Sequence, residues 1–328
     1  MTGLDLSLVD DCTALAEHVA DRFEASIAGL VGQGVEGGLL DARRVEAACR
    51  HRGGPLPARA LQYFDLGLRL MQDDEAGAGL ALEDLGQEAS WDRVTAVQPF
   101  DSALLGRDFD RLAALMFGER IESLRIEGPG PEDLERIRAQ HDDVLAAISA
   151  LAPEIGDEFE ALVDVVVLAA PTTPELDSYG SATTLAAMGL ILINPIAALG
   201  FLDHFGTYVH EVTHMVLHAL TGDERLSVND EHERFSSPLR TDPRPMEGVV
   251  HATIVCARMA AMYQRLAASD DQRRGDSHAR AVDLHMRFED GASLIERSAT
   301  LSPLGHDIWN RTRELTRMEC PRSSTAQG

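Results

Sequence analysis

The stretch YVHEVTHMVLHAL, Tyr208 to Leu220, constrains the fold more than any other part of the sequence. It contains His-Glu-x-x-His at His210, Glu211 and His214, surrounded by apolar residues at helical spacing. Residues four apart on an α-helix lie on one face, one turn apart, so both imidazoles can face a single divalent cation. The pattern predicts a helix over about 206–221 that carries two metal ligands.

Two short apolar runs before this helix predict β-strands. The first is ALVDVVVLAAP, Ala161 to Pro171, and the second is AAMGLILINP, Ala186 to Pro195. Residues 189–194 of the second run are expected to form an edge strand that leads toward the motif helix. An extended peptide can pair with such a strand.

The rest of the chain is expected to be helical, with breaks at clusters of Gly and Pro. Helices are predicted over Pro131–Leu151 and Met246–Ala268, with one or two more over Ser277–Met318. The expected fold class is α+β, mainly helical, with a small sheet packed on the motif helix in a zincin-like core. Residues 1–155 form a helical N-terminal region, an accessory domain or a lid, and residues 156–320 form the metal-binding catalytic domain. Residues 321–328 form a disordered tail.

The charge of the chain excludes several functions. Its 328 residues include 54 acidic and 29 basic ones, which gives a net charge of -25, and all 29 basic residues are arginine. Without lysine there is no pyridoxal phosphate Schiff base, no P-loop and no lysine nucleophile. So acidic a surface repels nucleic acid and anionic membranes, and neither is expected as a partner.

The beginning of the sequence and the cysteines predict a cytoplasmic protein. The first residues carry acids where a signal peptide carries positive charge, and no apolar run is long enough to span a membrane. Cys12, Cys49, Cys256 and Cys320 lie far apart without a C-x-x-C pair, so free thiols are expected. The sequence predicts no particular oligomeric state.

The third metal ligand has several candidates. Glu231 and Glu233 follow His214 by 17 and 19 residues, close to the spacing of one class of zinc peptidases, but their segment is polar and broken by proline. His251 lies inside an apolar helix, where a buried imidazole needs a partner. A metal held by two other histidines would be such a partner. The alternative is that His251 is a core histidine that binds no metal. His218 extends the row by a further turn and is expected to support or pack against the ligands.

The motif and the segment after it resemble a known family. HEVTH is followed by FSSPLRTDPRPMEGVVHATIV, Phe235 to Val255, in which Ser-Pro-x-Arg and Asp-Pro-Arg-Pro precede a helix with a histidine. This combination resembles the HExxH motif proteins of peptide-modification gene clusters, which are 2-oxoglutarate-dependent peptide β-hydroxylases. The resemblance covers about residues 189–260. It implies that His210, His214 and His251 bind iron(II), and that Arg240 and Arg244 hold an anionic co-substrate or substrate.

The chemistry of such a centre can also be argued from the residues. Three protein ligands leave three positions on iron(II) for a bidentate keto acid and dioxygen, and the distal carboxylate of the keto acid needs a cationic partner. Arg258 lies two helical turns after His251 and is a third candidate for that partner. For Arg240, Arg244 and Arg258 alike, the alternative is an ordinary ion pair.

The role of Glu211 separates the possible mechanisms. In a zinc peptidase it is the general base that takes a proton from metal-bound water, whereas in an oxygenase it orients a ligand or the substrate. The first interpretation is an iron(II)- and 2-oxoglutarate-dependent oxygenase that hydroxylates a β-carbon of a precursor peptide or peptide-like natural product precursor. The alternatives are a zinc metallopeptidase and a non-catalytic peptide-binding partner in a biosynthetic cluster.

Overall fold

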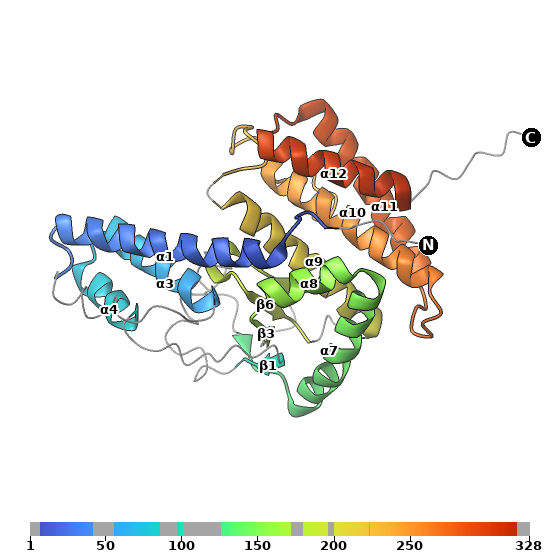
Figure 1. The fold of residues 1–328 in the computed structure, drawn as a ribbon, viewed down its shortest axis with the longest axis horizontal. Helices are drawn as coiled ribbons and strands as arrows, with labels where there is room; N and C mark the ends of the chain where they lie inside the picture. The colour runs from blue at the N-terminus through green and yellow to red at the C-terminus, as the bar shows by residue number, and fades with distance from the viewer. Residues whose placement is uncertain are drawn as a thin grey trace, which may run out of the picture. The chain divides into compact units, whose positions relative to one another are not determined.

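The computed structural model describes residues 7–41, 56–85, 97–100, 126–171, 180–195, 200–222 and 224–319. Its described residues form two compact units (Figure 1). One, called here the motif unit, includes residues 7–10, 140–159 and those after 200. The other, called the sheet unit, lies within residues 11–139 and 160–197. This division differs from the expected boundary at 155/156, because the strands after residue 160 pair with a strand from the N-terminal half.

Three helices of the sheet unit share an apolar core. They are α1 (Cys12–Glu36), α3 (Leu56–Met71) and α4 (Glu75–Leu85). The Asp11 carboxylate caps α1 by accepting a hydrogen bond of 2.9 Å from the Ala14 amide, as is usual for this residue at a helix start. Residues spaced three or four apart along α1 face this core, which includes Ile27, Val31, Leu40, Leu66, Ala78, Ala81 and Leu82.

The sheet unit contains a mixed four-stranded sheet in the order β1-β3-β6-β5, of which Figure 1 shows β1, β3 and β6 side by side. Its strands are β1 (Val97–Pro99), β3 (Val165–Leu168), β6 (Leu190–Ile193) and β5 (Ser181–Ala182). The two β-branched runs therefore form strands, as the sequence predicts. The β1–β3 and β3–β6 pairs are parallel, whereas β5–β6 is antiparallel. Every residue of β3 and β6 is buried, as is usual for parallel strands.

The expectation that residues 189–194 form an edge strand is wrong. β6 has β3 on one side, and on the other Ser181 and Ala182 of β5 pair with Ile193 and Leu192. The main-chain groups that a peptide would need along this end of β6 are already used. β5 is only two residues long, and a local apolar pattern does not reveal so short a strand.

Two smaller elements and two helices complete the region before the motif. The strands β2 (Ile126–Glu127) and β4 (Ala170–Pro171) form an antiparallel pair. A 3-10 turn, η2 (Leu185–Ala187), precedes β6. The helix α7 (Pro131–Leu151) has the bounds that the sequence predicts, and α8 (Pro153–Leu162) follows it after one residue.

The motif unit contains four long helices. They are α9 (Phe201–Thr221), α10 (Met246–Ala268), α11 (Ser277–Ser298) and α12 (Pro303–Glu319). α10 packs against α9, α11 and α12 (Figure 1). α9 ends at Gly222, whose φ of 51° is a conformation that favours glycine. α10 has the predicted bounds, and most of its residues are buried.

The described residues thus confirm a mainly helical α+β fold with a small sheet. None of the helices within these residues is both long and apolar enough to cross a membrane. Cys49, Cys320 and the expected tail at 321–328 lie outside the described residues. Cys256 is a buried free thiol.

Candidate metal centre

Three histidines form a row along one half-buried face of α9. The spacing of four residues places His210, His214 and His218 on successive turns. The ring centroids of His210 and His214 are 4.9 Å apart, and those of His214 and His218 are 6.4 Å apart. The row continues past the His-Glu-x-x-His motif.

His251 on α10 joins this row from the neighbouring helix. It is 9% exposed, and its ring stacks on His214 with a centroid distance of 5.9 Å and an interplanar angle of 22°. Its centroid is 5.5 Å from that of His218. The helix packing of α9 and α10 therefore brings together histidines that are 37 residues apart in sequence (251 minus 214). His218, which was expected only to support the ligands or pack against them, therefore also lies beside His251.

The spacing of the rings can be compared with that of bound ligands. Imidazoles that share one metal ion have ring centroids roughly 5 Å apart, because each coordinating nitrogen is about 2 Å from the metal. His210 and His214 have this spacing, and His214 and His251 are somewhat farther apart. Within the described residues, no three His, Cys, Asp or Glu side chains are gathered closely enough to hold a metal as they stand. Small movements of the rings are needed, and the donor set fits a divalent transition metal.

The histidines of the α9 row favour the neutral form. Burial and, as a smaller cause, the positive charge of Arg240 together lower the pKa of His210 to about 4. The pKa of His214 is lowered well below its ordinary value by burial and by its neighbours His210, His251, His218 and Arg240. Burial and His251 lower the pKa of His218 to about 3. Neutral imidazoles have the lone pair that a metal requires.

Arg240 lies in a closed loop beside the histidines. Phe235 and Arg244 exchange two backbone hydrogen bonds of 2.8 Å, which close the loop between them. Arg287 of α11 donates a hydrogen bond of 3.1 Å to the carbonyl of Pro238 and so fixes the middle of the loop. The positive charge of Arg240 lowers the pKa of both His210 and His214. Arg240 has no ion pair with any residue that the structure describes.

Arg244 has a different setting from Arg240. Its guanidinium forms an ion pair of 2.8 Å with Asp242, and both side chains are partly exposed. The Nε of Arg244 is buried and has no hydrogen-bond partner among the described residues. Arg244 therefore stabilises the loop through its backbone and retains one donor on its side chain.

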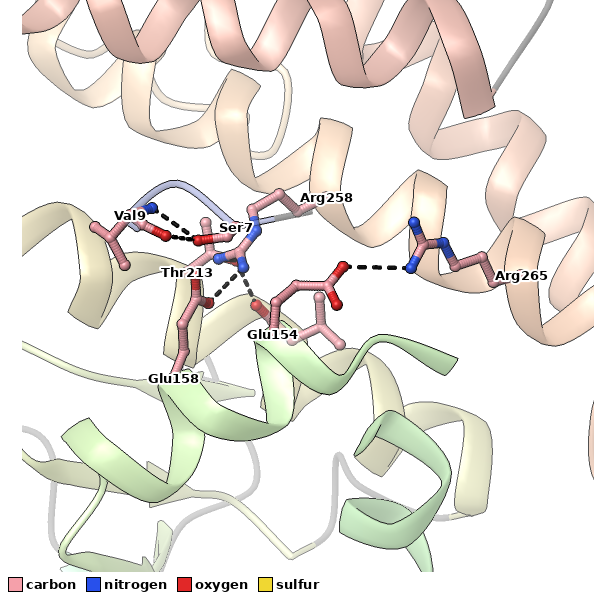
Figure 2. Close-up of polar contacts among 8 residues, drawn as sticks. Ser7, Val9, Glu154, Glu158, Thr213, Arg258 and Arg265 are labelled. Carbon is pink, nitrogen blue, oxygen red and sulfur yellow. Dashed lines mark hydrogen bonds and ion pairs between the residues drawn. The ribbon is translucent and has the colours of Figure 1, made fainter. Parts of the chain in front are cut away.

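Arg258 forms a buried ion pair, as Figure 2 shows. It contacts the carboxylate of Glu158 on α8, both side chains are fully buried, and its Nη1 donates to the Thr213 hydroxyl at 3.2 Å. Burial raises the pKa of Glu158, and Arg258 opposes that shift. These contacts occupy the terminal nitrogens of Arg258. The side chain therefore forms an ordinary ion pair, which is the alternative to an anion-binding role that the sequence left open.

Glu211 lies beside the first histidine of the motif. Its side chain is 2% exposed, and its Oε1 is 3.9 Å from Nε2 of His210. The carboxylate is thus close to one imidazole of the candidate centre and largely shielded from water.

The glutamate alternatives for the third ligand occupy exposed positions. Glu231 is 63% exposed and lies 3.6 Å from Arg225, and Glu233 is exposed as well. Within the described residues, neither is among the groups that shift the pKa values of His210, His214 and His218. Their segment is not helical, as its composition predicts.

Glu247 is a residue that sequence reasoning missed. Its Oε1 accepts a hydrogen bond of 3.0 Å from the Leu226 amide, and its Oε2 accepts one of 2.8 Å from the Ser227 amide. Its Oε1 is also 3.3 Å from Nε2 of His251. Burial raises the pKa of Glu247, but hydrogen bonds from His251 and from the two amides more than offset this and lower it. An acid four residues before a histidine on one helix is the signal that was available in the sequence.

The loop that meets Glu247 is itself fixed by the start of α12. The Leu226 carbonyl accepts a hydrogen bond of 2.9 Å from the Ser302 amide, and Ser227 pairs with Leu301 in an isolated bridge. A Cβ at Gly305 would lie only 2.0 Å from the Leu226 carbonyl oxygen. The backbones of the loop and of α12 therefore approach more closely than a side chain at position 305 allows.

A second buried polar contact lies on α9 before the motif. The Tyr208 hydroxyl contacts Nδ1 of His141 on α7, and the ring of His204 packs edge-on against Tyr208 at a centroid distance of 4.4 Å. All three side chains are buried, and burial raises the pKa of Tyr208. This contact stabilises the packing of α7 on α9.

No family model matches the sequence, and no protein of curated function is significantly similar to it. The function is therefore proposed from the side chains of the candidate centre and their geometry.

Proposed function

We propose that the protein is an iron(II)- and 2-oxoglutarate-dependent oxygenase that hydroxylates a β-carbon of a peptide or peptide-like natural product precursor. The observation that carries this proposal is the grouping of His210, His214 and His251 next to an arginine without an ion pair among the described residues. The resemblance in the motif region supplies the reaction class.

The three histidines are the proposed iron ligands. They come from two packed helices, which is a rigid way to hold a set of ligands. His210 and His214 are neutral near pH 7, so each can offer a lone pair without first losing a proton. A set of three nitrogen ligands leaves half of an octahedral shell for exogenous oxygen ligands. The centre thus suits a co-substrate that binds the metal through two oxygens.

Arg240 is the proposed partner for the distal carboxylate of 2-oxoglutarate. Its charge acts on His210 and His214, so an anion bound by this guanidinium lies close to the metal ligands. Arginine can bind a carboxylate with two parallel hydrogen bonds. Arg244 has one unpartnered nitrogen within the described residues and is a second candidate for an anionic group. Arg258 is not a candidate, because it forms a buried ion pair with Glu158.

Glu211 is proposed to orient His210 or the substrate. The carboxylate is buried close to that imidazole, where it favours one position of the ring. With iron bound, the centre supplies the chemistry by which dioxygen converts 2-oxoglutarate to succinate and CO2 and a C–H bond of the substrate to C–OH. The protein side chains would bind the anion and the metal.

Succinate formation tests this proposal. Protein purified without a histidine tag is reconstituted anaerobically with iron(II), and succinate is measured after adding 2-oxoglutarate and oxygen. Turnover without substrate peptide is expected to be slow but measurable. It should disappear in His214→Ala. In Arg240→Gln the KM for 2-oxoglutarate should rise by about 10-fold or more, since a charge-assisted pair is worth about 1.5–3 kcal/mol.

A matched control is available in the same segment. Arg234 is exposed, as Arg240 is, and among the described residues it donates only to the carbonyls of Glu231 and Glu233, so Arg234→Gln should leave that KM unchanged. Equal effects of the two substitutions would contradict the role of Arg240. A reconstituted protein that holds iron stoichiometrically and forms no succinate would contradict the oxygenase.

A zinc peptidase is the second candidate, because Glu211 lies beside a proposed ligand. In that case Glu211→Gln should abolish hydrolysis of an unstructured peptide by the zinc-loaded protein and leave zinc binding intact. The oxygenase predicts no hydrolysis in either form. A protein that binds neither iron nor zinc would instead be a non-catalytic peptide-binding partner.

A further inference from the structure

The Glu247 carboxylate lies between a loop and a proposed metal ligand. Its two oxygens face three nitrogens, which are the amides of Leu226 and Ser227 and Nε2 of His251, at 2.8 to 3.3 Å. We infer that Glu247 is a positioning residue that fixes His251 with its hydrogen on Nε2, so that Nδ1 is the nitrogen that faces the metal. The part of this inference that concerns the metal rests on the proposed function.

The hydrogen-bonding capacity of the groups leads to this assignment. Backbone amides only donate, so both oxygens of Glu247 act as acceptors. An imidazole nitrogen next to an accepting oxygen must carry a hydrogen, because two lone pairs repel each other. In its neutral form, the ring of His251 then has its only lone pair on Nδ1. A metal binds through that lone pair, and the partner of the other nitrogen sets the tautomer.

Glu247 is held in place independently of His251. It lies in the first turn of α10, where the helix N-terminus favours a negative charge. The two amides that it accepts from belong to a loop fixed by α12 through the Ser302 amide and the Ser227–Leu301 bridge. The carboxylate therefore has a fixed position and can impose an orientation on the ring four residues later.

The same loop has a second anchor that does not involve Glu247. The Asn229 side-chain oxygen accepts from the Ser227 hydroxyl at 2.8 Å and from the Thr300 amide at 2.7 Å. Its side-chain nitrogen donates to the Ser298 carbonyl at 2.9 Å. Asn229→Ala therefore loosens the loop without touching the contact between Glu247 and His251, and it is a matched control.

The tautomer can be measured without a metal. In metal-free protein labelled with ¹⁵N-histidine, two-bond correlation spectra distinguish the protonated ring nitrogen from the unprotonated one. His251→Gln identifies the signals of His251 by their loss. The wild-type protein should have the hydrogen of His251 on Nε2, and Glu247→Gln should shift the ring toward the other tautomer or a mixture, because a glutamine also presents a donor. A wild-type ring with its hydrogen on Nδ1 overturns the inference without any variant.

Metal affinity tests the second part. Cobalt(II) is titrated into the metal-free protein, and its visible absorption reports the ligand geometry. Glu247→Gln should weaken binding by about 10- to 100-fold and change the spectrum, as is common when the partner of a ligating histidine is removed. Asn229→Ala should keep the wild-type affinity and spectrum. An equal loss in both variants would show that Glu247 acts only through the loop, which overturns the inference.

The outcomes separate this inference from the proposed function. Suppose that wild-type protein binds no cobalt(II) but has His251 in the expected tautomer, dependent on Glu247. The metal centre then fails, and the assignment of Glu247 stands. Suppose instead that cobalt(II) binds equally well to the wild type and to Glu247→Gln with one spectrum. The metal centre then stands, and the role of Glu247 is refuted.

Discussion

Two polar clusters of the α9–α10 pair differ in how deeply they are buried and in whether their charges are paired. In one, Arg258 meets Glu158 and Thr213, and all three side chains are fully buried. In the other, the rings of His214 and His251 are stacked, and the α9 face of that cluster is half-buried. A buried pair of opposite charges belongs to the interior of the fold, whereas imidazoles on a half-buried face next to an arginine can bind a ligand. The difference assigns Arg258 to the stability of the fold and supports the proposal that His210, His214 and His251 are metal ligands.

The largest expected effect is on the buried cluster. Arg258→Met leaves the Glu158 carboxylate buried without its cation and should destabilise the protein by about 3–5 kcal/mol. The midpoint of urea denaturation, followed by circular dichroism, measures this loss. Adding Glu158→Leu should recover most of it, because an apolar pair avoids the buried charge. Failure of Arg258→Met to destabilise would remove the contrast between the two clusters.

A fall in pH should destabilise the protein through the histidine cluster, by less than Arg258→Met does. Unfolded His210 takes up a proton near pH 6.5, but folded His210 does so only near pH 4. The unfolded state therefore binds more protons between these values, and stability is full above about pH 6.5 and is lost as the pH falls toward 4. The loss from His210 should be on the order of 1–2 kcal/mol at pH 5.

The denaturation midpoint at pH 7.5 and at pH 5 tests this expectation. His210→Gln should reduce the difference between the two values, since glutamine does not titrate. A variant with the full wild-type dependence on pH would show that other groups cause the loss.

The smallest expected effect sharpens the role of Arg240. Its charge is the second cause of the low pKa of His210, after burial. Arg240→Gln should therefore raise that pKa modestly while leaving it below the ordinary value of about 6.5. Titration of the histidine signals by NMR measures the change, and Arg234→Gln is the control. An unchanged pKa in Arg240→Gln would place the guanidinium farther from the centre than proposed.

Local signals in the sequence were sufficient for several helices. The bounds of α7 and α10 match the prediction, because Pro131 and Pro245 mark their starts. α9 begins five residues earlier than expected, at Phe201 rather than Gly206. Gly206 is inside the helix, where a Cβ would lie 2.2 Å from the Tyr263 hydroxyl, so it allows close packing and does not start the helix.

Contacts between distant segments were not predictable in the same way. β6 lies inside the sheet because it pairs with both β3 and β5. β3 lies far from it along the chain, and β5 is only two residues long. The sequence pointed to His210, His214 and His251, and helix packing places the ring of His251 beside that of His214, whereas metal binding itself stays a prediction. The ion pair of Arg258 and the contact of Glu247 depend on which helix faces which, and sequence spacing does not give that information.

The close approach of Gly305 to Leu226 has a consequence for how this sequence can vary. Position 305 is far from the histidines in sequence and touches no proposed ligand, yet any side chain there would push away the loop that presents two amides to Glu247. In a library of all single substitutions selected for metal binding, Gly305 should be nearly as intolerant as Glu247. Such intolerance at a helix start is easily mistaken for a packing effect, although its origin is the placement of one carboxylate.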